Sequence, residues 1–351
     1  PGTAIVPADR AVIRPVSGVA LAKSEARLTL EGVPDQPGSS HTLFSQLAAA
    51  SIAVDMIIQN AGHGGTANIS FTVPEDDLEA ALAITGEVAA ALGAGSLTYD
   101  RNLAKVSVVG LGMATAEGVA GQLFAAISAA GINVNMITTS EIKISVLVSR
   151  EDAARAVAAA HQAFGLEAVD GHLTAATPLP MTKSDPLEVV RRLEGMEDLA
   201  IEGCQLDASQ SLVTFIDLPD TPGVVADVFA EIGQAGLFVD MIVQSFPQAG
   251  RAEVSFTVSV ADRDRAVSVA EAIAAARGVR VTDVPHVAKL SITGVGIRSH
   301  AGVADRLFAP LAEAGINIDL VSTSEVRVNV IVAAEAGERA LALLRQAFGL
   351  D

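Results

Sequence analysis

The stretch Lys105-Val-Ser-Val-Val-Gly-Leu-Gly-Met113 returns later in the chain as Lys289-Leu-Ser-Ile-Thr-Gly-Val-Gly-Ile297. The likeness continues in the same order, since Ala130-Gly-Ile-Asn-Val-Asn135 corresponds to Ala314-Gly-Ile-Asn-Ile-Asp319. Self-similarity at a fixed spacing is the signature of repeated structural units, and it has to be recognised before any element is assigned. Ordered matches of this length indicate that the second half of the chain duplicates the first.

The duplication between the halves includes the turn Pro34-Asp-Gln-Pro-Gly38, which corresponds to Pro219-Asp-Thr-Pro-Gly223. Each half also contains a second, weaker duplication within itself. Within the first half, Val33–Phe71 and Val109–Val146 share one order of short strand, glycine turn, helix and two strands. The sequence therefore predicts four units, two in each half.

Unit one shows the order of elements most clearly. Residues alternate between apolar and polar in its first strand, as a half-buried strand requires. Leu43, Phe44 and Leu47 form one apolar stripe, as an amphipathic helix requires. The predicted elements are the strand Ala26–Gly32, a helix after Pro37-Gly38, the strands Ile52–Ile58 and Ala67–Val73, the helix Glu75–Leu92 and a strand from Ser96. This βαββαβ order is the ferredoxin-like arrangement, in which helices cover one face of an antiparallel sheet. The predicted fold class is α+β.

The second unit of each half lacks a fourth strand of its own. Each half, however, begins with an extra apolar run, Val16–Leu21 or Leu199–Cys204. We predict that these runs supply the missing strands, so that the two units of a half are interlaced. The predicted divisions are 25–101 for unit one, 16–24 plus 102–168 for unit two, a linker at 169–197, 207–285 for unit three, and 198–206 plus 286–351 for unit four.

Composition excludes several classes of protein. The formal net charge of -18 over 351 residues argues against a nucleic-acid partner, which needs a basic surface. The lone Cys204 cannot form an intrachain disulfide and fits a reducing compartment, so a cytoplasmic location is predicted. Apolar runs are too short to span a membrane. The chain starts at Pro1-Gly2-Thr3 without an initiator methionine, which favours a piece of a longer protein.

No motif for catalysis or metal binding stands out. The sequence has neither a P-loop nor a GxSxG elbow, and Gly110-Leu-Gly112 lacks the rest of a dinucleotide fingerprint, so a tight strand-to-helix turn is the favoured interpretation. The residues His63, His161 and His172 lack the spacing of metal ligands. His300, in a glycine-flanked turn, is open to two interpretations, a ligand contact or an ordinary loop residue. No catalytic residue and no metal site are predicted.

Polar residues gather instead at strand ends and at turns into helices. Residues Asp35–Ser40 place a carboxylate and exposed amides at a helix N-terminus, which suits a ligand carboxylate. Asp55 and Gln59 share one face of a strand, and the polar interruptions of unit two are Asn133, Asn135, Ser140 and Glu141. A free α-amino acid needs both kinds of group. Two structural alternatives stay open: Asp35 could only cap its helix or turn, and Asp55 could face solvent.

Together these motifs resemble the regulatory ACT domains of aspartate kinases. The segments that carry the resemblance are Pro34–Gly38, Ile52–Asn60, Ile69–Thr72 and Gly131–Val146, with their counterparts in the second half. Pro1-Gly-Thr-Ala-Ile5 resembles the end of the kinase domain of that family, so residues 1–15 are interpreted as its tail and a linker. Two ACT pairs in tandem resemble the four-ACT enzymes of some bacterial groups.

The resemblance implies feedback inhibition by lysine, threonine or both, bound where the ACT units of a pair, or of two chains, face each other. For the first pair it implies the ligand-binding residues Asp35, Gly38, Ser39, Ser40, Asp55 and Gln59, with Met113, Asn133, Val134, Asn135, Ser140 and Glu141. For the second pair it implies Asp220, Gly223, Val224, Val225, Asp240 and Gln244, with Ile297, Ser299, His300, Asn317, Ile318, Asp319, Ser324 and Glu325.

Two segments depart from the family pattern. The family's Ser-His-Pro-Gly turn is kept in part as Ser299-His300-Ala301-Gly302 and has become Thr115-Ala116-Glu117-Gly118 in the first half. In the second half Val224 and Val225 replace Ser39 and Ser40. The two pairs therefore need not bind the same ligand.

For the longer protein the resemblance implies an aspartate kinase that uses ATP and Mg²⁺ to phosphorylate the side-chain carboxylate of aspartate. It also implies a homodimer and control of a kinase domain in the same chain. The Lys-Phe-Gly-Gly type of ATP motif does not occur in these residues, so the fragment itself is expected to be non-catalytic. The alternative is a stand-alone ACT sensor that acts on another enzyme through protein contact.

Overall fold

In the computed structural model the described residues are 15–60, 64–110, 113, 118–140, 142–166, 200–247, 249–295, 297, 300, 302–324 and 326–350. The first half forms β1 (Gly18–Pro34), α1 (Ser39–Ala49), β2 (Ile57–Gln59), β3 (Thr66–Pro74), α2 (Leu78–Leu92), β4 (Ser96–Val109), α3 (Val119–Ala129), β5 (Met136–Ser140), β6 (Lys143–Ser149) and α4 (Ala153–Ala163). The second half repeats this order as β7 (Ala200–Pro219), α6 (Val224–Gln234), β8 (Ile242–Gln244), β9 (Arg251–Ser259), α7 (Arg263–Arg277), β10 (Arg280–Val295), α8 (Gly302–Glu313), β11 (Leu320–Ser324), β12 (Arg327–Ala333) and α9 (Gly337–Phe348). The predicted fold class is confirmed.

The leading apolar run of each half is the first part of a long strand that two units share. In β1, Gly18 pairs with Val109 of β4, and β4 pairs in turn with β6 of unit two. Farther along the same strand, Leu28 pairs with Tyr99 and belongs to unit one. In the second half β7 and β10 pair in the same way. The units of each half are therefore interlaced, with one continuous strand in place of two separate ones.

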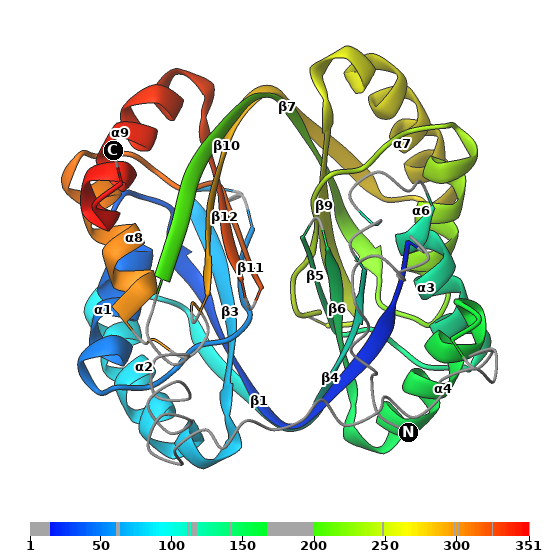
Figure 1. Cartoon of the computed structure of the whole chain (residues 1–351), viewed down its shortest axis with the longest axis horizontal. Helices are drawn as coiled ribbons and strands as arrows, with labels where there is room; N and C mark the ends of the chain where they lie inside the picture. The colour runs from blue at the N-terminus through cyan, green and yellow to red at the C-terminus, as the bar shows by residue number, and fades with distance from the viewer. Residues whose placement is uncertain are drawn as a thin grey trace, which may run out of the picture.

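The strands form one closed array in the order β1-β3-β2-β11-β12-β10-β7-β9-β8-β5-β6-β4. Figure 1 shows that the array consists of two facing sheets with the helices on their outer sides, and that β1 with β4 and β7 with β10 cross from one sheet to the other. We call the sheet that contains β2 and β11 sheet one, and the sheet that contains β5 and β8 sheet two. Sheet one joins unit one to unit four, and sheet two joins unit two to unit three.

Each seam between units is an edge-to-edge strand pair covered by a helix pair. In sheet one, Gln59 of β2 pairs with Val321 of β11. Over that seam α1 packs on α8, where the rings of Phe44 and Phe308 stack with 5.2 Å between their centroids. In sheet two, β5 pairs with β8 and α3 packs on α6. Apolar burial under the helices thus supports each seam.

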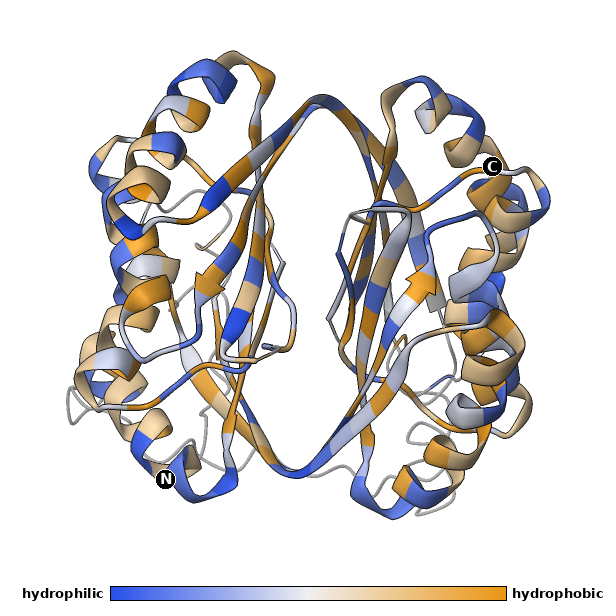
Figure 2. Cartoon of the chain, turned by 180° about the vertical axis from the view of Figure 1, so that it is seen from behind, coloured by the Kyte–Doolittle hydropathy of each residue, from blue (hydrophilic) through white to orange (hydrophobic). Residues whose placement is uncertain are grey.

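Polar and apolar residues alternate along much of the long strands, as the banding in Figure 2 shows. In β1, Ala26, Leu28 and Leu30 face the helices and belong to the core of sheet one. The helices of sheet two cover a second core. A third core fills the space between the sheets and contains Met56, Ile58, Leu103, Met136, Leu147, Leu212, Met241, Val243, Val287, Leu320 and Ile331. Both faces of each sheet are therefore buried.

None of the helices in the described part of the chain is long and apolar enough to cross a membrane.

Gly110 directly follows β4 and lies beside Pro15 and Val16, the residues that lead into β1. A Cβ at Gly110 would lie 1.9 Å from the carbonyl oxygen of Pro15 and 2.7 Å from Cα of Val16. Both are backbone atoms, which cannot move aside without shifting the start of β1. The glycine that the sequence assigned to a tight turn is required by this close approach of two chain segments.

We expect Gly110→Ala to lower the free energy of unfolding by at least about 2 kcal/mol, because the added methyl overlaps backbone. Urea unfolding followed by circular dichroism measures the effect. Gly86→Ala is the matched control: Gly86 lies inside α2 with nothing within 4 Å of its added Cβ. There alanine should stabilise the helix by about 0.5–1 kcal/mol. Equal effects of the two changes would contradict this placement of Pro15 and Val16.

Candidate functional site

The seam of sheet one brings together polar residues from units one and four. The side-chain amide of Gln59 donates from Nε2 to the carbonyl oxygen of Ile318 at 2.7 Å, and its Oε1 accepts a hydrogen bond from Ser40. Asn317 donates from Nδ2 to Oδ1 of Asp35 at 2.9 Å. These bonds tie the N-terminal turn of α1 to the segment before β11.

The seam of sheet two repeats this arrangement with one difference. Gln244 donates from Nε2 to the carbonyl oxygen of Val134 at 3.0 Å, and Asn133 donates to Asp220 at 3.0 Å. Gln244 is 1% exposed, and its Oε1 has no hydrogen-bond partner among the described residues. The cause lies in the sequence, because Val225 stands where unit one has Ser40. A buried acceptor is thus left open at this seam.

Helix N-termini border both seams. Helix α1 begins after Gly38, whose φ is 97°, and α6 begins after Gly223, whose φ is 100°. These glycines are the N-cap residues, so Asp35 is not the N-cap of α1, and its carboxylate accepts a hydrogen bond from Asn317 instead. Residues of the first turn of each helix line a shallow cavity at each seam, about 10 Å³ in sheet one and about 20 Å³ in sheet two.

A second pair of sites lies beside two aspartates that pair with lysines. Asp55 bonds to Lys105, and Asp240 bonds to Lys289. Asp55 is only 7% exposed, which rules out the solvent-facing alternative. The backbone carbonyl of Asp55 also accepts a hydrogen bond of 2.6 Å from the hydroxyl of Thr323 in β11.

The site at Asp240 is an open cavity of about 440 Å³ between units two and three. The first turn of α3 forms one wall, and Asp240 with Lys289 forms another. Its lining residues are Met113, Gly118, Val119, Ala120, Gly121, Thr139, Ser140, Ile144, Asp207, Gln210, Phe229, Ile232, Gly233, Leu237, Phe238, Val239, Asp240, Ile242, Ser259 and Lys289. The equivalent site at Asp55 holds about 20 Å³ and is bordered by Val303 and Ala304 of α8.

Comparison with known proteins identifies the units. A family model described as an ACT domain matches residues 28–86, 106–164 and 290–348, and a second ACT model matches residues 212–278. This chain belongs to the ACT-domain family. We call units one to four ACT1 to ACT4 from here on.

Its relatives are aspartokinases. An aspartate kinase of Stutzerimonas stutzeri is 42% identical over 174 residues, which cover 49% of this chain and 42% of that protein. An aspartokinase of Pseudomonas aeruginosa is 44% identical over 153 residues, which cover 44% of this chain and 37% of that one. The crystal structure of an aspartate kinase from Synechocystis superposes with a TM-score of 0.84 at 30% identity, covering 97% of this chain and 56% of that chain. The chain thus spans less than half the length of the curated relatives. The predicted resemblance to aspartokinases with tandem ACT domains is confirmed.

The predicted grouping of the ligand residues needs a correction. The sequence analysis combined ACT1 with ACT2 and ACT3 with ACT4. In the structure the Asp35 segment of ACT1 meets Asn317 of ACT4, and the Asp220 segment of ACT3 meets Asn133 of ACT2. The reason is the interlacing, because the shared strands hold the two units of a half in different sheets. That these residues bind a ligand stays a prediction.

Most of the remaining predicted residues line the same four places. The cavity at Asp240 includes Met113 and Ser140, the site at Asp55 includes Ile297, His300 and Ser324, and the shallow cavities include Gly38, Ser40, Val134, Gly223, Val225 and Ile318. Ser39 donates to the carbonyl oxygen of Pro34, and the backbone amide of Val224 donates to Thr221, so both hold turns. The residues Glu141, Ser299 and Glu325 lie outside the described part of the chain.

Among the residues of the open cavity and its counterpart that were not predicted are Lys105, Lys289, Asp207 and Gln210. A signal for the lysines was present. Each begins one of the two repeated stretches, and strand alternation places it opposite the helix-facing residue that follows it. A lysine that points into a buried face requires a partner. The partner could not be named, because it comes from a distant unit.

Asp35 and Asp319 give the seam of sheet one a distinct electrostatic character. Burial, together with the nearby carboxylates of Asp35 and Glu335, raises the pKa of Asp319 to about 6. ACT2 has the neutral Asn135 at the equivalent position, where the backbone amide donates to Leu147 as that of Asp319 does to Ile331. The acidic seam is therefore specific to ACT1 and ACT4.

We expect Asp319→Asn to flatten the pH dependence of stability. A carboxyl group with a raised pKa in the folded state stabilises the fold at low pH, and that contribution is lost as pH rises from about 4 to about 6. At pH near 7 the wild-type chain should therefore gain about 1–3 kcal/mol from the change. Urea unfolding across this pH range gives the measurement. Asn135→Asp is the converse control and should introduce such a dependence at sheet two. Parallel pH profiles for Asp319→Asn and wild type would refute the assignment.

Proposed function

We propose that this chain is the effector-sensing region of an aspartokinase and that it binds lysine and threonine at the seams between ACT units. The observation that carries the proposal is the open cavity of about 440 Å³, which has a helix N-terminus on one side and a carboxylate on the other. An α-amino acid carries the complementary pair of charges. Lysine and threonine are the effectors that the family resemblance implies.

The cavity suits the two charges of an amino-acid backbone. The N-terminal turn of α3, at Val119 and Ala120, offers amides without partners inside the helix, and such amides bind carboxylates. Asp240 supplies an acceptor for the α-ammonium. Because the lining is otherwise largely apolar, both interactions operate in a partly desolvated space, which strengthens them.

Two polar residues of the cavity lining favour a basic side chain. They are Asp207 and Gln210, and Gln210, 7% exposed, has an Oε1 without a hydrogen-bond partner among the described residues. Hydrogen bonds from Ser209 and Gln210 and the charge of Lys289 outweigh burial and lower the pKa of Asp207, which keeps it ionised. A side-chain ammonium would satisfy the open Gln210 oxygen and neutralise Asp207. These features support lysine as the ligand.

The shallow cavity of sheet two favours a smaller ligand. Val134 lines it, and behind Val134 lies Gln244, whose unpartnered Oε1 is an acceptor for an ammonium or hydroxyl group. The α6 N-terminus at Gly223 and Val225 offers amides for a carboxylate. The cavity of about 20 Å³ has room for about one water, so threonine, whose short side chain and hydroxyl match these groups, would bind as the two units move apart at this seam.

Regulation would follow as a population shift. A ligand bound at a seam favours the arrangement of the two ACT units that contacts it best, by as much as its affinities for the two arrangements differ. In the longer protein that arrangement would hold a kinase domain inactive. That domain would use ATP with Mg²⁺ to phosphorylate the side chain of aspartate, in a cytoplasmic homodimer.

Calorimetry of the 351-residue chain tests the proposal. We expect binding heats with lysine and with threonine, and none with methionine or isoleucine. Norleucine, which lacks the ε-amine of lysine, should bind at least about tenfold more weakly than lysine, because a buried hydrogen bond to a charged group is lost.

Gln210→Met tests whether the side chain of lysine binds beside Asp207 and Gln210. It should remove most of the preference for lysine over norleucine and leave threonine binding unchanged, since Gln210 is absent from the shallow cavity. No heat with any of the four natural amino acids would overturn the proposed function. Heat with an unaltered preference in Gln210→Met would overturn only the placement of lysine.

An exchange of two residues tests the threonine site. We expect Val225→Ser to weaken threonine binding about tenfold, because the new hydroxyl can bond to Gln244 as Ser40 bonds to Gln59. Ser40→Val should open Gln59 in the same way and strengthen binding at the seam of sheet one. Titration calorimetry of both variants against wild type gives the two affinities. Unchanged threonine affinity in Val225→Ser would exclude Gln244 as a ligand contact.

A further inference from the structure

The space between the two sheets contains two lysines that reach from one sheet to the other. Apolar side chains fill most of this space, including Leu103, Leu147 and Met241. Lys105 and Lys289 are buried on the same inner faces, at 3% and 8% exposure. Charged groups in such a position need close partners, and both lysines find theirs on the opposite sheet.

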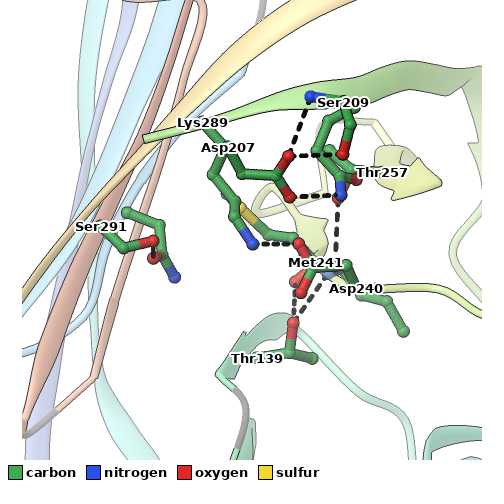
Figure 3. A network of polar contacts seen from close by, with 11 residues as sticks. Thr139, Asp207, Ser209, Asp240, Met241, Thr257, Lys289 and Ser291 are labelled. Atoms are coloured by element: carbon green, nitrogen blue, oxygen red, sulfur yellow. Dashed lines mark hydrogen bonds and ion pairs between the residues drawn. The ribbon is translucent and has the colours of Figure 1, made fainter. Parts of the chain in front are cut away.

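Lys289 comes from β10, in the part of that strand that pairs with β12 of ACT4 in sheet one. Its neighbours Ala288 and Leu290 face the helices, so its own side chain points between the sheets. There it bonds to Asp240 of ACT3 in sheet two, the aspartate of the open cavity. Figure 3 shows Lys289 and Asp240 directed toward each other, with Asp207 beside the lysine.

Lys105 forms the matching contact in the opposite direction. It lies on the part of β4 that pairs with β6 of ACT2 in sheet two, and it bonds to Asp55 of ACT1 in sheet one. The side chains of Lys105 and Asp55 are 4% and 7% exposed, and Glu25 lies 3.9 Å from the lysine nitrogen. Each sheet thus supplies a lysine to the effector-site aspartate of the other.

The strand register shows that these lysines are specific to ACT2 and ACT4. The equivalent positions in ACT1 and ACT3 are Arg27 and Leu212. The guanidinium of Arg27 lies over the ring of Phe246, 3.3 Å from its centroid, and Leu212 is part of the apolar core between the sheets. Among the described residues, the hydrogen bonds of Arg27 go to Thr29 and Thr98, and Leu212 has no polar side-chain atom to offer either aspartate. Packing between the sheets therefore does not require a lysine at this position.

We propose that Lys105 and Lys289 are positioning residues that couple the effector sites of the two sheets. The inference rests on the proposed function, since it concerns the same aspartates. A ligand ammonium at Asp240 competes with Lys289 for that carboxylate and so weakens the contact between β10 and sheet two. Because the exchange is reciprocal, the position of β10 also changes the affinity of the cavity.

A contiguous set of contacts joins β10 to the other site. Strand β10 pairs with β12, and β12 pairs with β11. The hydroxyl of Thr323 in β11 donates to the carbonyl oxygen of Asp55 and accepts from the amide of Ile57 at 2.8 Å. In sheet two, Thr139 of β5 accepts from the amide of Ile242 at 2.7 Å and so repeats the contact beside Asp240. Either lysine can therefore transmit a shift to the aspartate of its own sheet.

Replacing Lys289 distinguishes coupling from a merely structural role, because the two predict opposite changes in the affinity for lysine. We expect Lys289→Met to bind lysine at least about tenfold more tightly than wild type, because the carboxylate of Asp240, 19% exposed, loses its competitor and is left unpaired in a partly buried position. Lys289→Arg should restore an affinity near that of wild type. A residue needed only for folding would lower the affinity when it is removed. Weaker or unchanged binding in Lys289→Met would overturn the proposal.

The coupling itself is measured with two ligands that bind different sheets. A chain with both Ser40→Val and Val225→Ser directs threonine to the seam of sheet one, while lysine binds the cavity of sheet two. In this chain saturating lysine should change the affinity for threonine at least about fivefold. With Lys105→Met or Lys289→Met added, this ratio should fall to about one. Arg155→Met, a change at a solvent-exposed side chain of α4, is the control and should keep the ratio. A ratio of one before either lysine is changed, or a ratio that both lysine variants retain, would also overturn the proposal.

A measurement without ligand distinguishes failure of the inference from failure of the proposed function. Urea midpoints of Asp240→Asn, Lys289→Met and the double variant should be strongly non-additive, since each single change breaks the same pair. Additive midpoints would show that Lys289 and Asp240 do not stabilise the fold as an ion pair between the sheets, and this would overturn the inference whatever the binding experiments show. If the midpoints are non-additive but no amino acid binds to wild type, the ion pair is confirmed. The proposed function and the coupling are then both overturned.

Discussion

Two pairs of long antiparallel strands, β1 with β4 and β7 with β10, determine how everything else is arranged. Each of these strands begins in one sheet and ends in the other. The two units that share a strand pair are held apart and cannot lie side by side in one sheet. The edges of β2 and β5 are therefore completed by β11 and β8 from the other half of the chain. This constraint places every seam, and every candidate ligand site, between the two halves.

Much of this could be predicted from local patterns. Repeated stretches revealed four units, apolar periodicity gave the order of elements, and the missing fourth strand of ACT2 pointed to Val16–Leu21. These inferences succeed because strand alternation and helical stripes are local properties of the chain. The partnering of ACT1 with ACT4 is different in kind. It follows from the course of β1 and β4 through both sheets, which no local period records. The residues of the seams were therefore named, but combined with the wrong partners.

The site residues that were missed have the same physical origin. The alternation in the repeated stretch shows that Lys105 and Lys289 face away from the helices, but their partners lie in units distant in sequence. Gln244 was named as a ligand residue, yet its open oxygen becomes visible only when the hydroxyl that would fill it is found absent. Gly110 looked like a turn glycine because its real constraint, the backbone of Pro15, lies almost a hundred residues upstream. Sequence reasoning recognises the residue, while tertiary contact supplies the reason.

The two seams share a scaffold and differ in chemistry. At both, a glutamine donates to a backbone carbonyl of the neighbouring unit, and an asparagine donates to an aspartate. Around these fixed bonds Ser40 is replaced by Val225, and Asp319 by Asn135, so the groups that border the candidate sites change while the interface is kept. In a symmetric pair of identical chains, one substitution alters both copies of a site at once. Duplication within one chain removes that restriction, so that each seam can acquire its own ligand preference on a common architecture.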